Sequence, residues 1–240
     1  MRITLSVIMF AYNEGDNIVP IVTETIRHLE QRLSDWLGDY QLVLVDDGST
    51  DDTAAKIDTL AAANARILPL SHGTNRGIGH AVKTGFSAAR MDYVTILPAD
   101  GQVTVSEIDK LVPGVLDGAD FVVGHYTQRK AVDGLGRFIL SRGLRAWMLV
   151  LLGVRQPMDG VYLFRRSLLK QIRLTSDTFF VNLELPIRAE RQRLDVRHVP
   201  VEVHPRRSGH SKVLGLQKVT AVGTEVVRLR LQFWKEHWSK

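Results

Sequence analysis

The chain contains no cysteine among its 240 residues. This absence excludes disulfide bonds, a cysteine nucleophile and thiolate metal sites. The longest purely apolar run, residues 146–154, is far shorter than the roughly 20 residues that a membrane-spanning helix needs, so we expect no such helix. Proline and glycine are not enriched, and 45% of the residues are hydrophobic, which predicts a folded domain with a sizeable core. The first residues lead straight into strand-like sequence, so we expect no signal peptide.

Positive charge is concentrated in the second half of the chain. Residues 1–124 hold 9 Lys and Arg against 17 Asp and Glu, whereas residues 125–240 hold 22 against 9. An acidic half followed by a basic half predicts an anionic partner for the second half, such as nucleic acid, an anionic membrane or a phosphorylated substrate. A solvated basic surface without a partner is the alternative.

The first 124 residues alternate between strand-like and helix-like segments. Helices are predicted between the strands from apolar spacings of three and four, as at Val22, Ile26 and Leu29. This alternation predicts an α/β fold with a mostly parallel sheet and helices on both of its faces. The predicted strands are residues 3–10, 41–45, 66–70, 93–97 and 121–124.

Two segments of the second half, residues 138–154 and 213–238, mix apolar and basic residues. Both are predicted to form amphipathic helices, and Trp147, Trp234 and Trp238 suit a membrane interface. The alternative is that these helices pack on the core of the protein itself, since periodicity alone does not separate the two.

Polar clusters follow four of the predicted strands. Ligands of doubly wound sheets bind at the carboxyl ends of the strands, so these clusters predict a binding site, although each alone is compatible with a turn. Paired carboxylates suit Mg²⁺ or Mn²⁺ holding a diphosphate. The chain lacks a P-loop, and its one dinucleotide-like stretch lacks the third glycine. The clusters are Ala-Tyr-Asn-Glu at 11–14, Asp-Asp-Gly-Ser at 46–49, Asn-Arg-Gly-Ile-Gly at 75–79 and Pro-Ala-Asp-Gly-Gln at 98–102.

Taken together, these clusters resemble those of the inverting family 2 glycosyltransferases of the GT-A fold. In the second half, residues 159–166, Glu184 before Arg188, and Arg206 with Lys212 are similar to the dolichol-phosphate mannose synthase branch. The resemblance covers residues 3–212. It implies a GT-A domain at 1–212, with a nucleotide-sugar half at 1–124 and an acceptor half at 125–212, followed by a basic amphipathic helix at 213–240.

The resemblance implies a nucleoside-diphosphate sugar donor, GDP-mannose or a UDP-sugar, and a polyprenyl phosphate acceptor, dolichyl or undecaprenyl. Asp100 and Gln102 would bind Mg²⁺ or Mn²⁺. Asp100, Arg206 and Lys212 would be the catalytic residues. Gly209 would allow the loop that carries Arg206 and Lys212 to close over the ligand. Glu184 would act as the base if the acceptor were a hydroxyl, and the alternative is that it supports Arg188 or Arg206. The residues implied to bind the nucleotide sugar are Tyr12, Glu14, Asp46, Asp47, Arg76, Asp100, Arg129 and Arg137.

Two positions depart from the family pattern. Pro98 stands where the family usually has the first Asp of Asp-x-Asp, which removes one carboxylate, and Phe10-Ala11 stands where Pro-Thr is common. The sequence therefore leaves three functions open. The first is a peripheral enzyme at the cytoplasmic face of a membrane that has no nucleic acid partner. A membrane-anchoring subunit could assist this enzyme. The second is a soluble glycosyltransferase with a hydroxyl acceptor, and the third is a catalytically weak subunit that binds nucleotide sugar or lipid.

Overall fold

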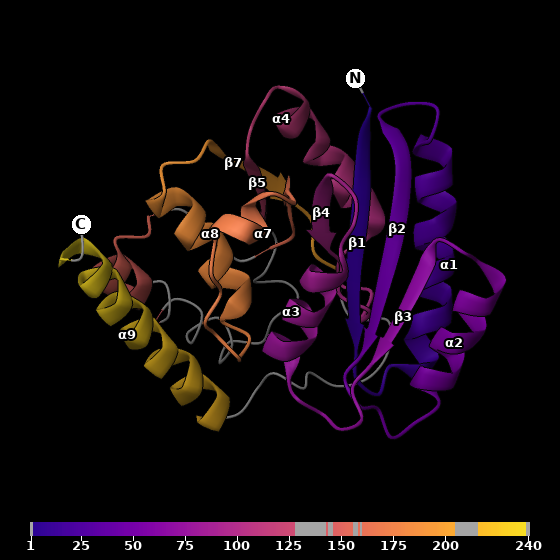
Figure 1. Ribbon diagram of the computed structural model, residues 1–240, viewed down its shortest axis with the longest axis horizontal. Helices are drawn as coiled ribbons and strands as arrows, with labels where there is room; N and C mark the ends of the chain where they lie inside the picture. The colour runs from indigo at the N-terminus through magenta and orange to yellow at the C-terminus, as the bar shows by residue number, and fades with distance from the viewer. Residues whose placement is uncertain are drawn as a thin grey trace.

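The computed structural model describes residues 2–127, 143, 146–155, 158, 160–204 and 216–238. Within this part of the chain, seven strands form one sheet in the order β3-β2-β1-β4-β6-β5-β7 (Figure 1). All of them run in the same direction except β6, which is antiparallel to both β4 and β5. The strands are β1 (Ile3–Ala11), β2 (Leu37–Asp46), β3 (Ile67–Ser71), β4 (Tyr93–Ile96), β5 (Phe121–Tyr126), β6 (Tyr162–Arg165) and β7 (Val196–Val201).

Helices cover both faces of this sheet. Strand β1 shows why, because Leu5 and Val7 pack in one apolar cluster and Ile8 packs in the other, as the alternation of side chains along a strand requires. The predicted mostly parallel sheet between helical layers is therefore confirmed. One face is covered by α1 (Gly15–Arg32), α2 (Thr53–Ala63), the 3-10 helix η1 (Val105–Lys110) and α4 (Val112–Leu116), and the other by α3 (Ile78–Ala88), α7 (Leu168–Gln171) and α8 (Val181–Arg191).

The last helix, α9 (Leu216–Trp238), packs against α8 at the side of the molecule far from β3 (Figure 1). Val226, Leu229 and Phe233 are buried there in a third apolar cluster, which includes Leu183 of α8. One face of α9 thus packs on the protein's own core, as the alternative prediction held.

The other face of α9 remains apolar and exposed at Val227, Leu231 and Trp234. Residues 146–152 are also helical and lie beside α9, because a Cβ added at Gly223 would be 3.5 Å from Cζ3 of Trp147. Among the described residues, no helix combines the length and apolar character needed to cross a membrane.

The two faces of α9 predict different effects on stability. Phe233 is 1% exposed, with the Arg191 guanidinium 4.2 Å from its ring centre, so Phe233→Ala should lower the free energy of unfolding by about 3–5 kcal/mol. Trp234 is 57% exposed, and Trp234→Ala should change it by less than about 0.5 kcal/mol. Urea unfolding of both variants checks this prediction. Equal losses would contradict the packing of α9 on α8.

Candidate active site

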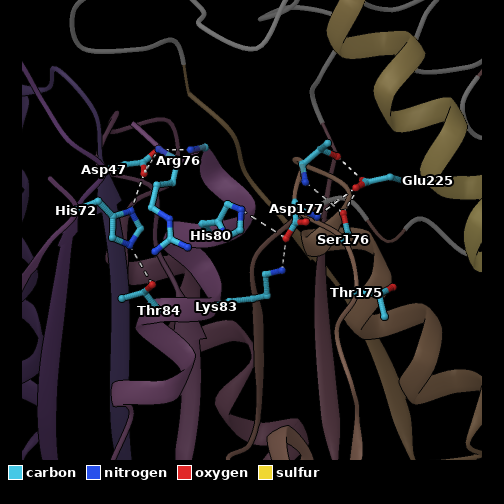
Figure 2. A network of polar contacts seen from close by, with 12 residues as sticks. Asp47, His72, Arg76, His80, Lys83, Thr84, Thr175, Ser176, Asp177 and Glu225 are labelled. Carbon is cyan, nitrogen blue, oxygen red and sulfur yellow. Dashed lines mark hydrogen bonds and ion pairs between the residues drawn. The ribbon is translucent and has the colours of Figure 1, made fainter. Parts of the chain in front are cut away.

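Asp47, which directly follows β2, holds the loop between β3 and α3 (Figure 2). Its carboxylate accepts the backbone N–H of Arg76 at 3.0 Å and that of Gly77 at 2.9 Å. The ring of His72 supports this carboxylate, with Nδ1 2.8 Å from Asp47 Oδ1 and Nε2 3.0 Å from Oγ1 of Thr84 on α3. Asp47 and His72 are buried, whereas Arg76 is exposed. The buried carboxylate of Asp47 therefore fixes the backbone of the residue whose guanidinium lies at the surface.

The turn after β2 approaches the β3–α3 loop closely at Gly48. This residue has a φ of 72°, and a Cβ there would fall 2.3 Å from the carbonyl carbon of Thr74, so only glycine fits. The Asp46 carboxylate closes the same turn by accepting the N–H of Ser49 at 3.2 Å and the hydroxyl of Ser71 at 3.1 Å. The predicted Asp-Asp-Gly-Ser cluster, residues 46–49, therefore forms one ordered corner after β2.

The loop after β1 is joined to this corner. Asn13 donates its N–H to Ser49 Oγ at 2.9 Å, and its side-chain Oδ1 accepts the N–H of Thr50 at 2.8 Å. These two bonds hold Asn13 in the left-handed conformation, with a φ of 51°. Tyr12 and Glu14 flank Asn13 and are half-buried, which places them at the edge of the sheet where β1 and β2 end side by side.

The turn after β4 carries Asp100 and Gln102. Asp100 Oδ1 accepts the N–H of Gln102 at 3.0 Å, and the Gln102 carbonyl accepts the N–H of His204 at 2.8 Å. The turn therefore lies beside the chain that leaves β7. In the part of the chain that the structure describes, no three His, Asp or Glu side chains gather in a way that could hold a metal ion.

Glu184 lies on α8, with 1% of its surface exposed. Its carboxylate accepts the backbone N–H groups of Thr175 at 3.0 Å and Ser176 at 2.8 Å, and Nε of Arg188 lies 2.7 Å away. These contacts support the turn that precedes α8. The role of Glu184 as a base stays a prediction.

The four strand-end clusters meet at one edge of the sheet, since β3, β2, β1 and β4 are neighbours and run in parallel. This edge gathers Tyr12, Glu14, Asp46, Asp47, Arg76, Asp100 and Gln102. Four predicted site residues, Arg129, Arg137, Arg206 and Lys212, lie outside the described residues, as does Gly209.

A second polar cluster, which no pattern in the sequence predicted, lies between α3 and the turn before α8. Lys83 pairs with Oδ1 of Asp177, and Nε2 of His80 lies 3.7 Å from the same oxygen. The Lys83 ammonium lowers the pKa of the Asp177 carboxyl. Lys83 and Asp177 lie 94 positions apart, so only the folded chain brings them together.

The family of this chain follows from comparison with known proteins. Residues 6–182 match the model of glycosyl transferase family 2. The chain belongs to glycosyltransferase family 2. A polyprenol monophosphomannose synthase of Mycolicibacterium smegmatis is 30% identical over 221 residues, covering 87% of this chain and 80% of that protein. A dolichyl-phosphate beta-glucosyltransferase of Trichomonas vaginalis is 26% identical over 247 residues, covering 95% of this chain and 71% of that protein.

Solved structures of glucosyl-3-phosphoglycerate synthase from Mycobacterium tuberculosis share the fold of this glycosyltransferase. The complex with UDP is 25% identical, has a TM-score of 0.66, and is matched over 96% of this chain and 79% of that one. The complex with Mg²⁺ and UDP is 23% identical, has a TM-score of 0.67, and is matched over 94% and 79%. The expected GT-A fold is therefore confirmed, and the division into nucleotide-sugar and acceptor halves stays a prediction.

Asp51, in the corner between β2 and α2, predicts a pH dependence of stability. Burial acts to raise the pKa of Asp51, but hydrogen bonds from Thr53 and from the N–H of Gly15 outweigh it, so the pKa is lowered. Ionised Asp51 therefore stabilises the fold above its unfolded pKa of about 3.9, and this contribution is lost as the pH falls through the lower native pKa. Asp51→Asn should be less stable than wild type at pH 7, with the difference shrinking towards pH 2.

Urea unfolding between pH 2 and pH 7 measures this difference. Asp58→Asn, at an exposed position on the helix α2 that follows this corner, is the matched control and should show little change. A constant difference for Asp51→Asn across this range would contradict the role of its carboxylate.

Proposed function

We propose that this glycosyltransferase transfers a sugar from a nucleoside-diphosphate sugar to a polyprenyl phosphate, with inversion and with the help of a divalent cation. The observation that carries the proposal is the meeting of four strand-end clusters at one edge of the sheet in a chain of this family. The names of the relatives, a polyprenol monophosphomannose synthase and a dolichyl-phosphate beta-glucosyltransferase, support the acceptor. A solved relative in complex with UDP supports the donor class.

The donor nucleotide is proposed to lie against Tyr12, Glu14 and Asp46, where the loops after β1 and β2 join. Asp47 affects nucleotide binding indirectly, because it fixes the backbone of Arg76. The exposed Arg76 side chain pairs with phosphate, because a guanidinium matches phosphate oxygens in charge and geometry. Arg129 and Arg137, outside the described residues, remain proposed phosphate contacts.

Asp100 and Gln102 offer one carboxylate and one amide oxygen to a cation. Such oxygens suit Mg²⁺ or Mn²⁺, and Mg²⁺ commonly takes one or two carboxylates and completes its shell with substrate phosphates and water. The residues present therefore fit a cation that is shared with the donor diphosphate, even with Pro98 in place of a second carboxylate. Such an ion would offset negative charge on the departing diphosphate.

The proposed chemistry needs no protein base. An acceptor phosphate oxygen attacks the anomeric carbon as the bond from that carbon to the diphosphate breaks, and the nucleoside diphosphate leaves. A phosphate monoester has a second pKa of about 6 and is largely dianionic at pH 7, so no proton has to be removed. The burial of Glu184 and its bonds to Thr175, Ser176 and Arg188 support a positioning role. Arg206 and Lys212 are proposed to pair with phosphate charge.

A panel of donors and acceptors tests the function. The protein is incubated with labelled GDP- and UDP-sugars and Mg²⁺ or Mn²⁺, and with either a polyprenyl phosphate or the corresponding polyprenol. Transfer to the phosphate alone is expected. Transfer to hydroxyl acceptors would favour the soluble alternative, and nucleotide binding without any transfer would favour the weak subunit to which Pro98 points.

Asp100→Ala should abolish transfer and the metal-dependent part of nucleotide binding, because Asp100 is the one carboxylate of the 98–102 cluster. Isothermal titration with UDP or GDP, with Mg²⁺ and with EDTA, measures the second effect. Circular dichroism should show an unchanged fold. Near-wild-type turnover in the folded variant would contradict the assignment of the metal site.

The exposed apolar faces of α9 and residues 146–152 are proposed to contact the cytoplasmic face of the membrane that holds the lipid acceptor. These two helices lie side by side, and exposed Arg228, Arg230 and Lys235 on α9 supply charge for an anionic surface. Whether a membrane-anchoring subunit assists stays open. The exposed apolar residues are Trp147, Leu149, Val150, Val227, Leu231 and Trp234.

Vesicle binding tests this surface. Leu231→Ala combined with Trp234→Ala should reduce co-sedimentation with anionic vesicles and leave nucleotide binding unchanged, since both residues lie on the exposed face of α9. Each basic residue near such a surface contributes about 1 kcal/mol, so binding should also weaken as salt rises. Leu116→Ala, at a 37% exposed leucine on α4, is the matched control. Equal binding of all variants would contradict the proposed surface.

A further inference from the structure

A buried carboxylate on α9 accepts hydrogen bonds from the turn that precedes α8. Glu225 accepts the hydroxyls of Ser176 and Thr178 and, at 3.1 Å, the backbone N–H of Asp177. It is 7% exposed, and Glu184 holds the other side of the same turn through the N–H groups of Thr175 and Ser176. Two carboxylates from two helices therefore determine where residues 175–178 lie.

The outer side of this turn touches the first turn of α3. The Asp177 carboxylate pairs with Lys83 and lies near His80 (Figure 2). The backbone of Asp177 packs directly against Gly79. A Cβ at Gly79 would fall 2.2 Å from the carbonyl carbon of Asp177, so the two segments are in contact without room for a side chain. A displacement of Asp177 must therefore move the start of α3, or open a gap beside it.

The start of α3 is continuous with the loop that Asp47 holds. Gly77 precedes the helix, and its carbonyl accepts the N–H groups of His80 at 3.0 Å and Ala81 at 3.2 Å. Asp47 binds the N–H groups of Arg76 and Gly77 from the other side. The loop is thus held between the sheet and the 175–178 turn.

We propose that Asp177 and Glu225 are positioning residues for the donor site, and that they make the placement of the Arg76–Gly77 loop depend on the seating of α9. This inference rests on the proposed function only in taking that loop as part of the donor site. Glu225 fixes the turn, Asp177 fixes the first turn of α3, and the loop follows. A helix that carries the proposed membrane surface is thereby connected to nucleotide binding by consecutive contacts.

Hydrogen exchange on the full chain tests the contacts without any ligand. Glu225→Gln places an amide donor opposite the donors of the turn, so the backbone amides of Arg76, Gly77, His80 and Ala81 should exchange faster than in wild type. Gly79→Ala perturbs the same contact from the other side and should raise exchange at residues 176–178. Asp39→Asn, which removes the exposed ion pair with Arg66 near the start of β2, is the matched control and should leave both regions unchanged.

Nucleotide affinity tests the consequence for the donor site. With Mg²⁺ present, titration with UDP and GDP should show dissociation constants raised about 2- to 30-fold in Glu225→Gln and in Asp177→Asn, the range typical of residues that act through coupling. Glu225→Gln combined with Gly79→Ala should raise the constant by less than the product of the single effects, because both changes break one contact. A merely destabilising role would give independent effects.

Unchanged exchange at residues 76–81 in Glu225→Gln and unchanged exchange at residues 176–178 in Gly79→Ala would overturn the proposal. Unchanged affinity in Glu225→Gln and Asp177→Asn, for a nucleotide that wild type binds, would also overturn it. If wild type binds neither UDP nor GDP, the proposed function fails instead, and the exchange experiment still decides whether α9 and the loop are coupled.

Discussion

The carboxylate of Asp47 is the point on which the arrangement of the candidate active-site edge depends. It is buried at the end of β2, and it accepts two consecutive backbone N–H groups, those of Arg76 and Gly77, from a loop some 30 positions further along the chain. Hydrogen bonds to a charged group contribute about 1.5–3 kcal/mol, more than those between neutral groups. His72 and Thr84 complete the chain of contacts and tie the same carboxylate to α3.

The same device recurs on the other side of α3. Glu184 and Glu225 are buried carboxylates that bind backbone and hydroxyl donors of one turn. In that turn, the backbone of Asp177 contacts Gly79. Irregular backbone segments are thus fixed by carboxylates supplied from neighbouring elements. Under the proposed function, loops fixed in this way would be ordered before a nucleotide arrives, which reduces the ordering cost of binding.

Local sequence patterns predicted the first five strands and the polar clusters after four of them, because apolar runs and turn residues act over short distances. They did not predict β6 and β7. Strand β6 is four residues long and is inserted antiparallel between β4 and β5, a pairing that only the long-range fold decides. Strand β7 contains Pro200, which argues against a central strand and is tolerated here because β7 lies at the edge of the sheet.

For the site, the sequence identified which residues gather at the sheet edge but not what their carboxylates bind. The resemblance implies a nucleotide contact for Asp47, and the sequence leaves Glu184 either a base role or a contact to Arg188. The structure shows protein donors around both carboxylates, with Arg188 among those of Glu184. Glu225 and Asp177 carried no signal, because their partners come from segments distant in the chain.

A crystal structure of the protein with UDP or GDP and Mn²⁺ would show directly whether the nucleotide binds at this edge of the sheet. We expect the nucleotide to lie at the edge formed by the ends of β1, β2 and β4, with Asp100 near the diphosphate. We also expect Asp47 to keep its hydrogen bonds to the backbone N–H groups of Arg76 and Gly77. A nucleotide bound elsewhere would contradict the proposed donor site, and an Asp47 carboxylate that releases both N–H groups to bind the nucleotide would contradict its role in holding the loop.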